Sequence, residues 1–188
     1  MLPAEWLGLE ASWQAVHAES LATLRQVSRS QGPSLEPAFL ATLPSQALDG
    51  LREAEACAQE ELGATIALLR ELVTAHEVLL EEMYEVERHE RSDVAQLSPE
   101  QAAHRGEHGL GCSPADRVSA LATSLHAYEA ELQIKQAAAS SVRAGMPAPE
   151  LQALVIAWEA QPLLEPVEAL RAGLESQEAL AASLDGIT

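Results

Sequence analysis

Apolar residues recur along this chain at alternating spacings of three and four positions, the pattern of amphipathic helices. The most regular stretch predicts a long helix over about residues 44–89 with a heptad seam on its buried face. A second regular stretch predicts a helix over about residues 114–144 that pairs antiparallel with the first. The two seams consist of Leu62, Ile66, Leu69, Val73, His76, Leu80 and Met83, and of Val118, Leu121, Leu125, Tyr128, Leu132, Lys135, Ala139 and Val142.

Three further helices complete the predicted fold. The first covers about residues 3–29 and ends before the glycine and prolines of residues 32–37. A short helix over about residues 149–160 follows a stop at Gly145, and a terminal helix begins at Pro162 to Pro166. Their predicted buried residues are Leu2, Trp6, Leu9, Trp13, Val16, Leu24 and Val27, then Leu151, Leu154, Val155 and Trp158, then Val167, Leu170, Leu174 and Leu184.

The polar, Gly-rich stretch at about residues 90–114 predicts a flexible connection, with at most one short helical turn after Ser98 and Pro99. Only 3% of the 188 residues are aromatic, and the abundance of Ala, Leu, Glu and Gln favours helix throughout. We therefore expect an all-α fold in one domain over residues 1–188. Its predicted form is an elongated antiparallel helical bundle or coiled-coil hairpin with a short C-terminal helical cap.

The net charge of the chain limits the classes of molecule that it is expected to bind. With 29 acidic and 11 basic residues the formal net charge is -18, which would repel a nucleic-acid backbone, so we expect no direct nucleic-acid binding. No stretch of 18 apolar residues and no signal peptide is visible, and the two cysteines are too few for a disulfide framework. We expect a soluble intracellular protein that binds no membrane.

Few residue patterns point to catalysis. His104-Arg-Gly-Glu-His108 matches the H-x-x-E-H motif of inverted zinc proteases, but glycines within and after the motif disfavour the helix that such a site requires. His76 lies on a seam, where a core or interface histidine is expected. The acidic run with Glu81, Glu82 and Glu85 could bind divalent cations, but it lacks calcium-ligand spacing and is typical of a solvated helix face. We expect no catalytic residue, no metal and no cofactor.

The C-terminal third carries the most informative spacing. Tyr128 is followed by Glu131, Leu132 and Lys135, and then, 23 residues after Lys135, by Trp158, Gln161 and Pro162. This order resembles the cyclin-dependent kinase 2-interacting protein (CINP) family, which has a Tyr-x-x-Glu-Leu-x-x-Lys run and a later Trp-x-x-Gln-Pro. Trp6 and Trp13 are similar to the early helix of that family. The resemblance covers about residues 6–16 and 118–164; residues 151–158 also resemble the ribosome maturation factor AIRIM family.

The resemblance implies a non-catalytic adaptor that pairs with an AIRIM-like helical protein and binds a hexameric AAA ATPase of the SPATA type. Such assemblies act in maturation of the large ribosomal subunit and in replisome turnover, with links to cell-cycle kinases, DNA replication and checkpoint signalling. We expect a nuclear and cytoplasmic protein, because the sequence has no basic cluster that would separate the two locations. Two departures affect the implied contacts, because this chain has Glu129 and Ala130 where the family tends to be basic, and Leu163 where an aromatic is common.

Two alternatives remain open at this point. One is a self-associating structural coiled coil, in which Leu62, Ile66, Leu69 and Val73 pair with a second copy. The other is a metal-dependent hydrolase built on His104 to His108. The roles of the three tryptophans are also open, because each can serve as intramolecular core or as a partner anchor beside Leu151, Leu154 and Val155.

Overall fold

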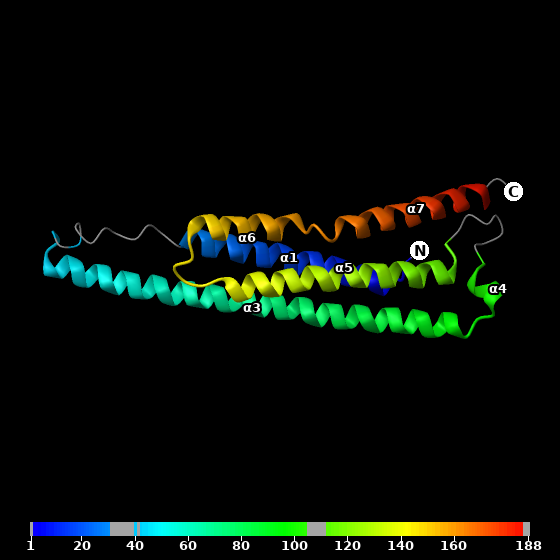
Figure 1. Ribbon diagram of the computed structural model, residues 1–188, viewed down its shortest axis with the longest axis horizontal. Coiled ribbons are helices and arrows are strands. Elements are labelled where there is room, and N and C mark those ends of the chain that lie inside the picture. The colour runs from blue at the N-terminus through cyan, green and yellow to red at the C-terminus, as the bar shows by residue number, and fades with distance from the viewer. Residues whose placement is uncertain (1, 31–39, 41, 105–111, 186–188) are drawn as a thin grey trace. The chain divides into compact units, whose positions relative to one another are not determined.

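The computed structural model describes residues 2–30, 40, 42–104 and 112–185, with the backbone only for residues 178, 181, 184 and 185. Within these ranges the chain forms helices and no strand, so the all-α prediction is confirmed (Figure 1). The helices are α1 (Ala4–Ser30), α3 (Ser45–Ala95), α4 (Pro99–Ala102), α5 (Pro114–Ser141), α6 (Ala148–Ala160) and α7 (Glu165–Asp185).

The chain divides into two compact units, and each draws on segments that lie far apart in the sequence. The first unit takes residues 1–15, 75–134 and 161–188, and the second takes residues 16–74 and 135–160. Each unit therefore holds one stretch of α1, α3 and α5, and the first adds α4 and α7 where the second adds α6. The single domain expected for residues 1–188 stays a prediction.

Contacts in the first unit show that α3 and α5 run antiparallel, as the seams predicted. Tyr84 Oη of α3 donates to Glu129 Oε2 of α5 at 3.0 Å. Further along α3, Glu90 Oε2 lies 3.8 Å from Nη2 of Arg117, which is nearer the start of α5. Rising positions on one helix thus meet falling positions on the other, which is the geometry of a helical hairpin.

The C-terminal helix of the first unit packs antiparallel to α1. Gln161 Nε2 donates to Gln14 Oε1 at 3.1 Å just before α7 begins, and Arg171 Nη1 lies 3.3 Å from Glu10 Oε2. Pro166 stands in the first turn of α7, where its missing N–H removes no helical hydrogen bond. Of the predicted α7 stripe, Val167 is buried and Leu170 and Leu174 are half-buried, while the Leu184 side chain lies outside the described atoms.

The heptad seams predicted burial accurately. All seven seam residues of α3, Leu62 to Met83, are buried, and so is the α5 seam except for Val118, which is half-buried. In contrast, no residue between positions 45 and 61 of α3 is buried. Heptad spacing therefore identifies the part of α3 that packs against other helices. Where the spacing is lost, at residues 45–61, the helix buries no side chain.

Several boundaries differ from the predictions. Helix α3 continues to Ala95, so the connection expected at residues 90–114 begins later. The short helical turn expected after Ser98 and Pro99 is α4. Its start is a capping box, in which Ser98 Oγ accepts from the Gln101 backbone N–H and Gln101 Oε1 accepts from the Ser98 N–H. Helix α5 ends at Ser141, before Gly145, whose φ of 76° only glycine adopts without strain.

Candidate functional site

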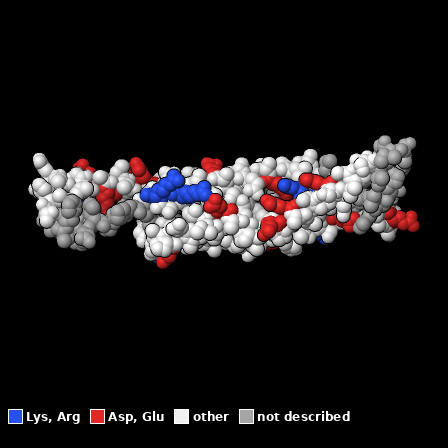
Figure 2. Space-filling model, turned by 90° about the horizontal axis from the view of Figure 1, so that it is seen from above, with Lys and Arg blue, Asp and Glu red and all other residues white. Residues whose placement is uncertain are grey.

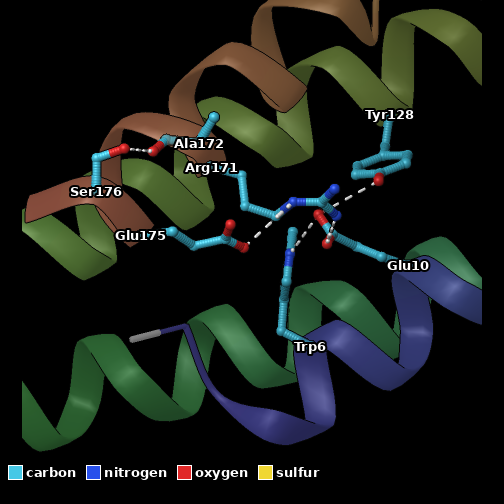
Figure 3. Close-up of polar contacts among 7 residues, drawn as sticks. All are labelled: Trp6, Glu10, Tyr128, Arg171, Ala172, Glu175 and Ser176. Atoms are coloured by element: carbon cyan, nitrogen blue, oxygen red, sulfur yellow. Dashed lines mark hydrogen bonds and ion pairs between the residues drawn. The ribbon is translucent and has the colours of Figure 1, made fainter. Parts of the chain in front are cut away.

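A buried carboxylate organises the core of the first unit (Figure 3). Glu10 of α1 is 5% exposed and accepts hydrogen bonds from Trp6 Nε1 at 2.9 Å and from Tyr128 Oη at 3.4 Å. Arg171 of α7 approaches its second oxygen at 3.3 Å. A buried carboxylate is costly unless it is paired and hydrogen-bonded, and Glu10 is both. One side chain thus joins α1, α5 and α7.

Aromatic rings surround this carboxylate. The Tyr128 ring meets Trp13 edge-on with centroids 4.9 Å apart and Trp6 at 6.4 Å, and Trp13 in turn meets His76 at 4.5 Å. Burial raises the pKa of the Tyr128 hydroxyl above its ordinary value, and the neighbouring Glu10 charge raises it further. Tyr128 therefore stays protonated as a donor to Glu10. His76 is fully buried, which confirms its expected place on the seam.

A second polar cluster lies in the core of the second unit. Lys135 of α5 is fully buried, with Nζ 3.0 Å from His17 Nδ1 and 4.9 Å from the centroid of the Trp158 ring. Trp158 Nε1 donates to Ser20 Oγ at 3.1 Å. Burial, and then the Lys135 charge, lower the pKa of His17 to about 4 from its ordinary 6.5. His17 is therefore neutral near pH 7, and its Nδ1 accepts the hydrogen bond from the lysine.

The motif residues singled out in the sequence are mostly framework. Trp6, Trp13, Tyr128, Glu131, Leu132, Lys135, Leu151 and Trp158 are buried, and they divide between the two units. Leu154, Val155 and Gln161 are half-buried, and Pro162 is exposed. All three tryptophans thus lie in the chain's own core, and Leu151, expected beside the partner surface, is fully buried as well.

Sequence reasoning missed the polar half of this core. It placed Leu9 and Val16 on the buried stripe of α1, but both are only half-buried, and Glu10, His17 and Ser20 take the buried positions. The missed signal is the spacing from the tryptophans, because Glu10 and His17 each follow one by four residues and so share its face. Arg171 carried no comparable signal, since its partner lies 161 positions away.

Gln161 marks the end of α6 by its backbone conformation. Its φ of 38° lies in the left-handed region, which costs a non-glycine residue roughly 1–2 kcal/mol. The hydrogen bond from its side chain to Gln14 and the following Pro162 hold the chain in this turn. The Gln-Pro pair therefore belongs to the turn that ends α6.

The predicted metal motif falls largely outside the described residues, since its positions 105–108 are among those not described, and His104 is exposed. Among the residues that are described, no three His, Cys, Asp or Glu side chains are grouped so that they could hold a metal ion. Within the same ranges, no helix combines the length and apolar character needed to cross a membrane.

Comparison with known proteins adds no identity. No protein-family model, no curated protein and no solved structure matches the chain. Figure 2 shows acidic side chains scattered over the face in view, with basic side chains beside some of them. In the second unit, Arg25 Nη2 and Glu159 Oε1 form an ion pair at 2.8 Å.

Proposed function

We propose that this protein is a non-catalytic adaptor that binds another protein through the outward face of α6. The observation that carries the proposal is the composition of that helix, Ala-Pro-Glu-Leu-Gln-Ala-Leu-Val-Ile-Ala-Trp-Glu-Ala. Large apolar side chains that a helix exposes outside its buried face are candidates for contact with another protein. Here only Leu151 and Trp158 are buried, Leu154 and Val155 are half-buried, and Ile156 is 60% exposed.

The inner face of α6 is fixed firmly enough to present the outer face as a rigid surface. Trp158 packs under Lys135, and its indole N–H is held by Ser20. The exposed residues Ala153, Ile156, Ala157 and Ala160 follow one another at helical spacing. A stripe with one large side chain among alanines lets a partner helix approach closely around a single protruding residue.

The partners implied by the resemblance to the CINP family give the proposal its specific form. In that form the chain pairs with an AIRIM-like helical protein and binds a SPATA-type AAA ATPase hexamer. It acts with them in large ribosomal subunit maturation and replisome turnover, in contact with cell-cycle kinases, in the nucleus and the cytoplasm. The support for this form is the ordered set of motif residues, which supply both clusters of the core.

The alternative of self-association through the α3 seam has less support. Leu62, Ile66, Leu69 and Val73, the residues expected to pair with a second copy, are all buried in the single chain. A homodimer through this seam would require these residues to give up their present contacts within the chain.

Purification of the tagged protein from its native cells, with mass spectrometry of the bound proteins, tests the proposal. Wild type should carry an AAA ATPase and a second small helical protein. Ile156→Lys should lose both without a change in melting temperature, because the side chain is exposed. Leu180→Lys is the matched control. Leu180 is 58% exposed on α7, and its replacement by lysine adds the same charge as Ile156→Lys.

The outcomes separate the general proposal from its specific form. If Ile156→Lys retains every partner of the wild type, α6 is not the docking surface. If wild type yields other stoichiometric partners that Ile156→Lys loses, the adaptor stands and the implied AAA ATPase does not. A wild-type chain that purifies alone contradicts the adaptor function.

A further inference from the structure

A groove separates two helix faces in the first unit. It has a volume of about 630 Å³ and is lined by Glu5, Gly8, Leu9 and Ser12 of α1 and by Glu82, Glu85, Val86 and His89 of α3. Both sets follow the same i, i+3, i+4, i+7 spacing, so each is one continuous helix face. At 1.5 Å per residue each wall is about 10 Å long, which is roughly two helical turns.

The floor of the groove is apolar and its centre is open. Leu9 is half-buried and Val86 is 8% exposed. Gly8 also lines the groove and is exposed, and a Cβ placed on it would meet no atom within 4 Å. The absence of a side chain at Gly8 thus leaves room for a backbone or a small side chain to approach α1.

The rim of the groove is acidic. Glu5 and Glu82 are exposed and take part in no ion pair among the described residues, whereas Glu85 pairs with Arg88 at 2.7 Å. These carboxylates are spread along two walls, and the described His, Cys, Asp and Glu side chains form no group of three that could hold one metal ion. The arrangement fits several separate positive charges better than a single cation.

We propose that this groove binds a lysine- or arginine-bearing helix of a partner protein. The small side chains of that helix would pack over Gly8 between Leu9 and Val86, and its basic side chains would reach Glu5 and Glu82 on the rim. This is the helix-in-groove mode of recognition, with the net charge of -18 favouring encounter with a basic partner. The inference rests on the proposed adaptor function and adds a second contact, separate from α6.

A titration of the purified full chain with a lysine–alanine helical peptide tests the groove directly. The peptide should be about 20 residues long, so that it forms a helix in isolation. Amide resonances in residues 5–12 and 82–89 should shift saturably, while a glutamate–alanine peptide of the same length should leave them unchanged. Resonance shifts spread evenly over the acidic surface would overturn the proposal.

Gly8→Leu fills the groove without disturbing the fold, because its side chain enters open space and leucine favours helix more than glycine does. It should weaken peptide binding about tenfold or more. Gly63→Leu is the matched control, a helical glycine whose Cβ also meets nothing within 4 Å but which lies outside the groove. Equal affinity of the two variants would contradict the groove as the binding site.

Charge is tested by a second pair of variants. Glu5→Gln with Glu82→Gln should weaken binding several-fold, whereas Glu53→Gln with Glu60→Gln, the same change of charge on exposed residues of α3, should have little effect. Equal weakening by both pairs would mean that only net charge matters, against the proposal. Because only the purified chain and a peptide are used, failure here leaves the co-purification result at α6 unaffected.

Discussion

Glu10 and His17 occupy positions on α1 that a simple apolar stripe would give to leucine. Each is matched by a polar partner on α5, Tyr128 for Glu10 and Lys135 for His17. Such buried polar pairs contribute little net stability, but leaving one member without the other is strongly destabilising. Within each unit, a shift of α1 against α5 would separate the pair, so we interpret each pair as fixing the alignment of the two helices in its own unit.

The His17–Lys135 pair predicts a specific pH dependence. Because the folded-state pKa of His17 is lowered to about 4 from 6.5, the unfolded chain takes up this proton first as the pH falls. The stabilisation is fully present above pH 6.5 and is lost as the pH falls toward 4. Between pH 7 and pH 5 the wild type should lose on the order of 2 kcal/mol more unfolding free energy than His17→Gln.

Urea unfolding of both proteins at several pH values measures this difference. Glutamine is chosen because it keeps an acceptor for Lys135 but does not titrate. His104→Gln, at an exposed histidine, is the control and should follow the wild type. Parallel stability curves for wild type and His17→Gln would show that His17 is not held neutral by the fold.

Sequence alone predicted the aromatic half of this core and missed the polar half. Trp6 and Trp13 lie on the predicted apolar stripe of α1, and Lys135 lies on the α5 seam, since spacing alone sets which face a residue occupies. Glu10 and His17 have the same helical spacing, but they are polar residues, and residue type alone predicts that they face solvent. Their burial depends on donors 118 positions away, and pairing over such a distance leaves no trace in local pattern.

At the scale of helices, α3 combines two stretches of different character. Residues 62–83 place seven seam side chains in the core, whereas residues 45–61 contain no buried residue. Helices draw most of their stability from tertiary packing, and an isolated stretch of about 15 residues is marginal in water. The two stretches should therefore differ in local stability although both are helical.

Amide hydrogen exchange followed by mass spectrometry should reveal this difference. Peptides from residues 45–61 should exchange by local opening, at least about a hundredfold faster than those from residues 66–83, which exchange only on global unfolding. Both stretches belong to one helix and are measured in the same sample, so a difference in their exchange rates does not come from solution conditions. Uniform protection along α3 would mean that the first stretch is covered, as in a self-associated coiled coil.

Helix ends were harder to predict than helix faces. Gly145 was expected to stop α5 at once, but the helix ends at Ser141 and the glycine serves the turn that follows. Helix α3 passed the expected end at residue 89, since no proline or glycine interrupts it before Ala95. A helix end depends on small local differences in free energy, whereas a seam is repeated over many residues.

At the scale of the whole molecule, electrostatic repulsion opposes folding. The 29 acidic residues face only 11 basic ones. Several of the ion pairs are exposed, among them Arg52–Asp49, Arg88–Glu85 and Arg171–Glu175. Exposed pairs contribute roughly 0–1 kcal/mol each, so they do not offset the repulsion among the remaining carboxylates.

Salt should therefore stabilise this protein. Raising NaCl from about 10 mM to about 200 mM shortens the Debye length from about 30 Å to below 10 Å. This screens repulsion between dispersed carboxylates more than it weakens the part-buried Glu10–Arg171 contact. The thermal midpoint should rise over this range. Glu53→Lys with Glu60→Lys brings the net charge from -18 to -14 and should reduce the salt dependence. A midpoint that falls with added salt would mean that attractive ion pairs outweigh the repulsion among the carboxylates.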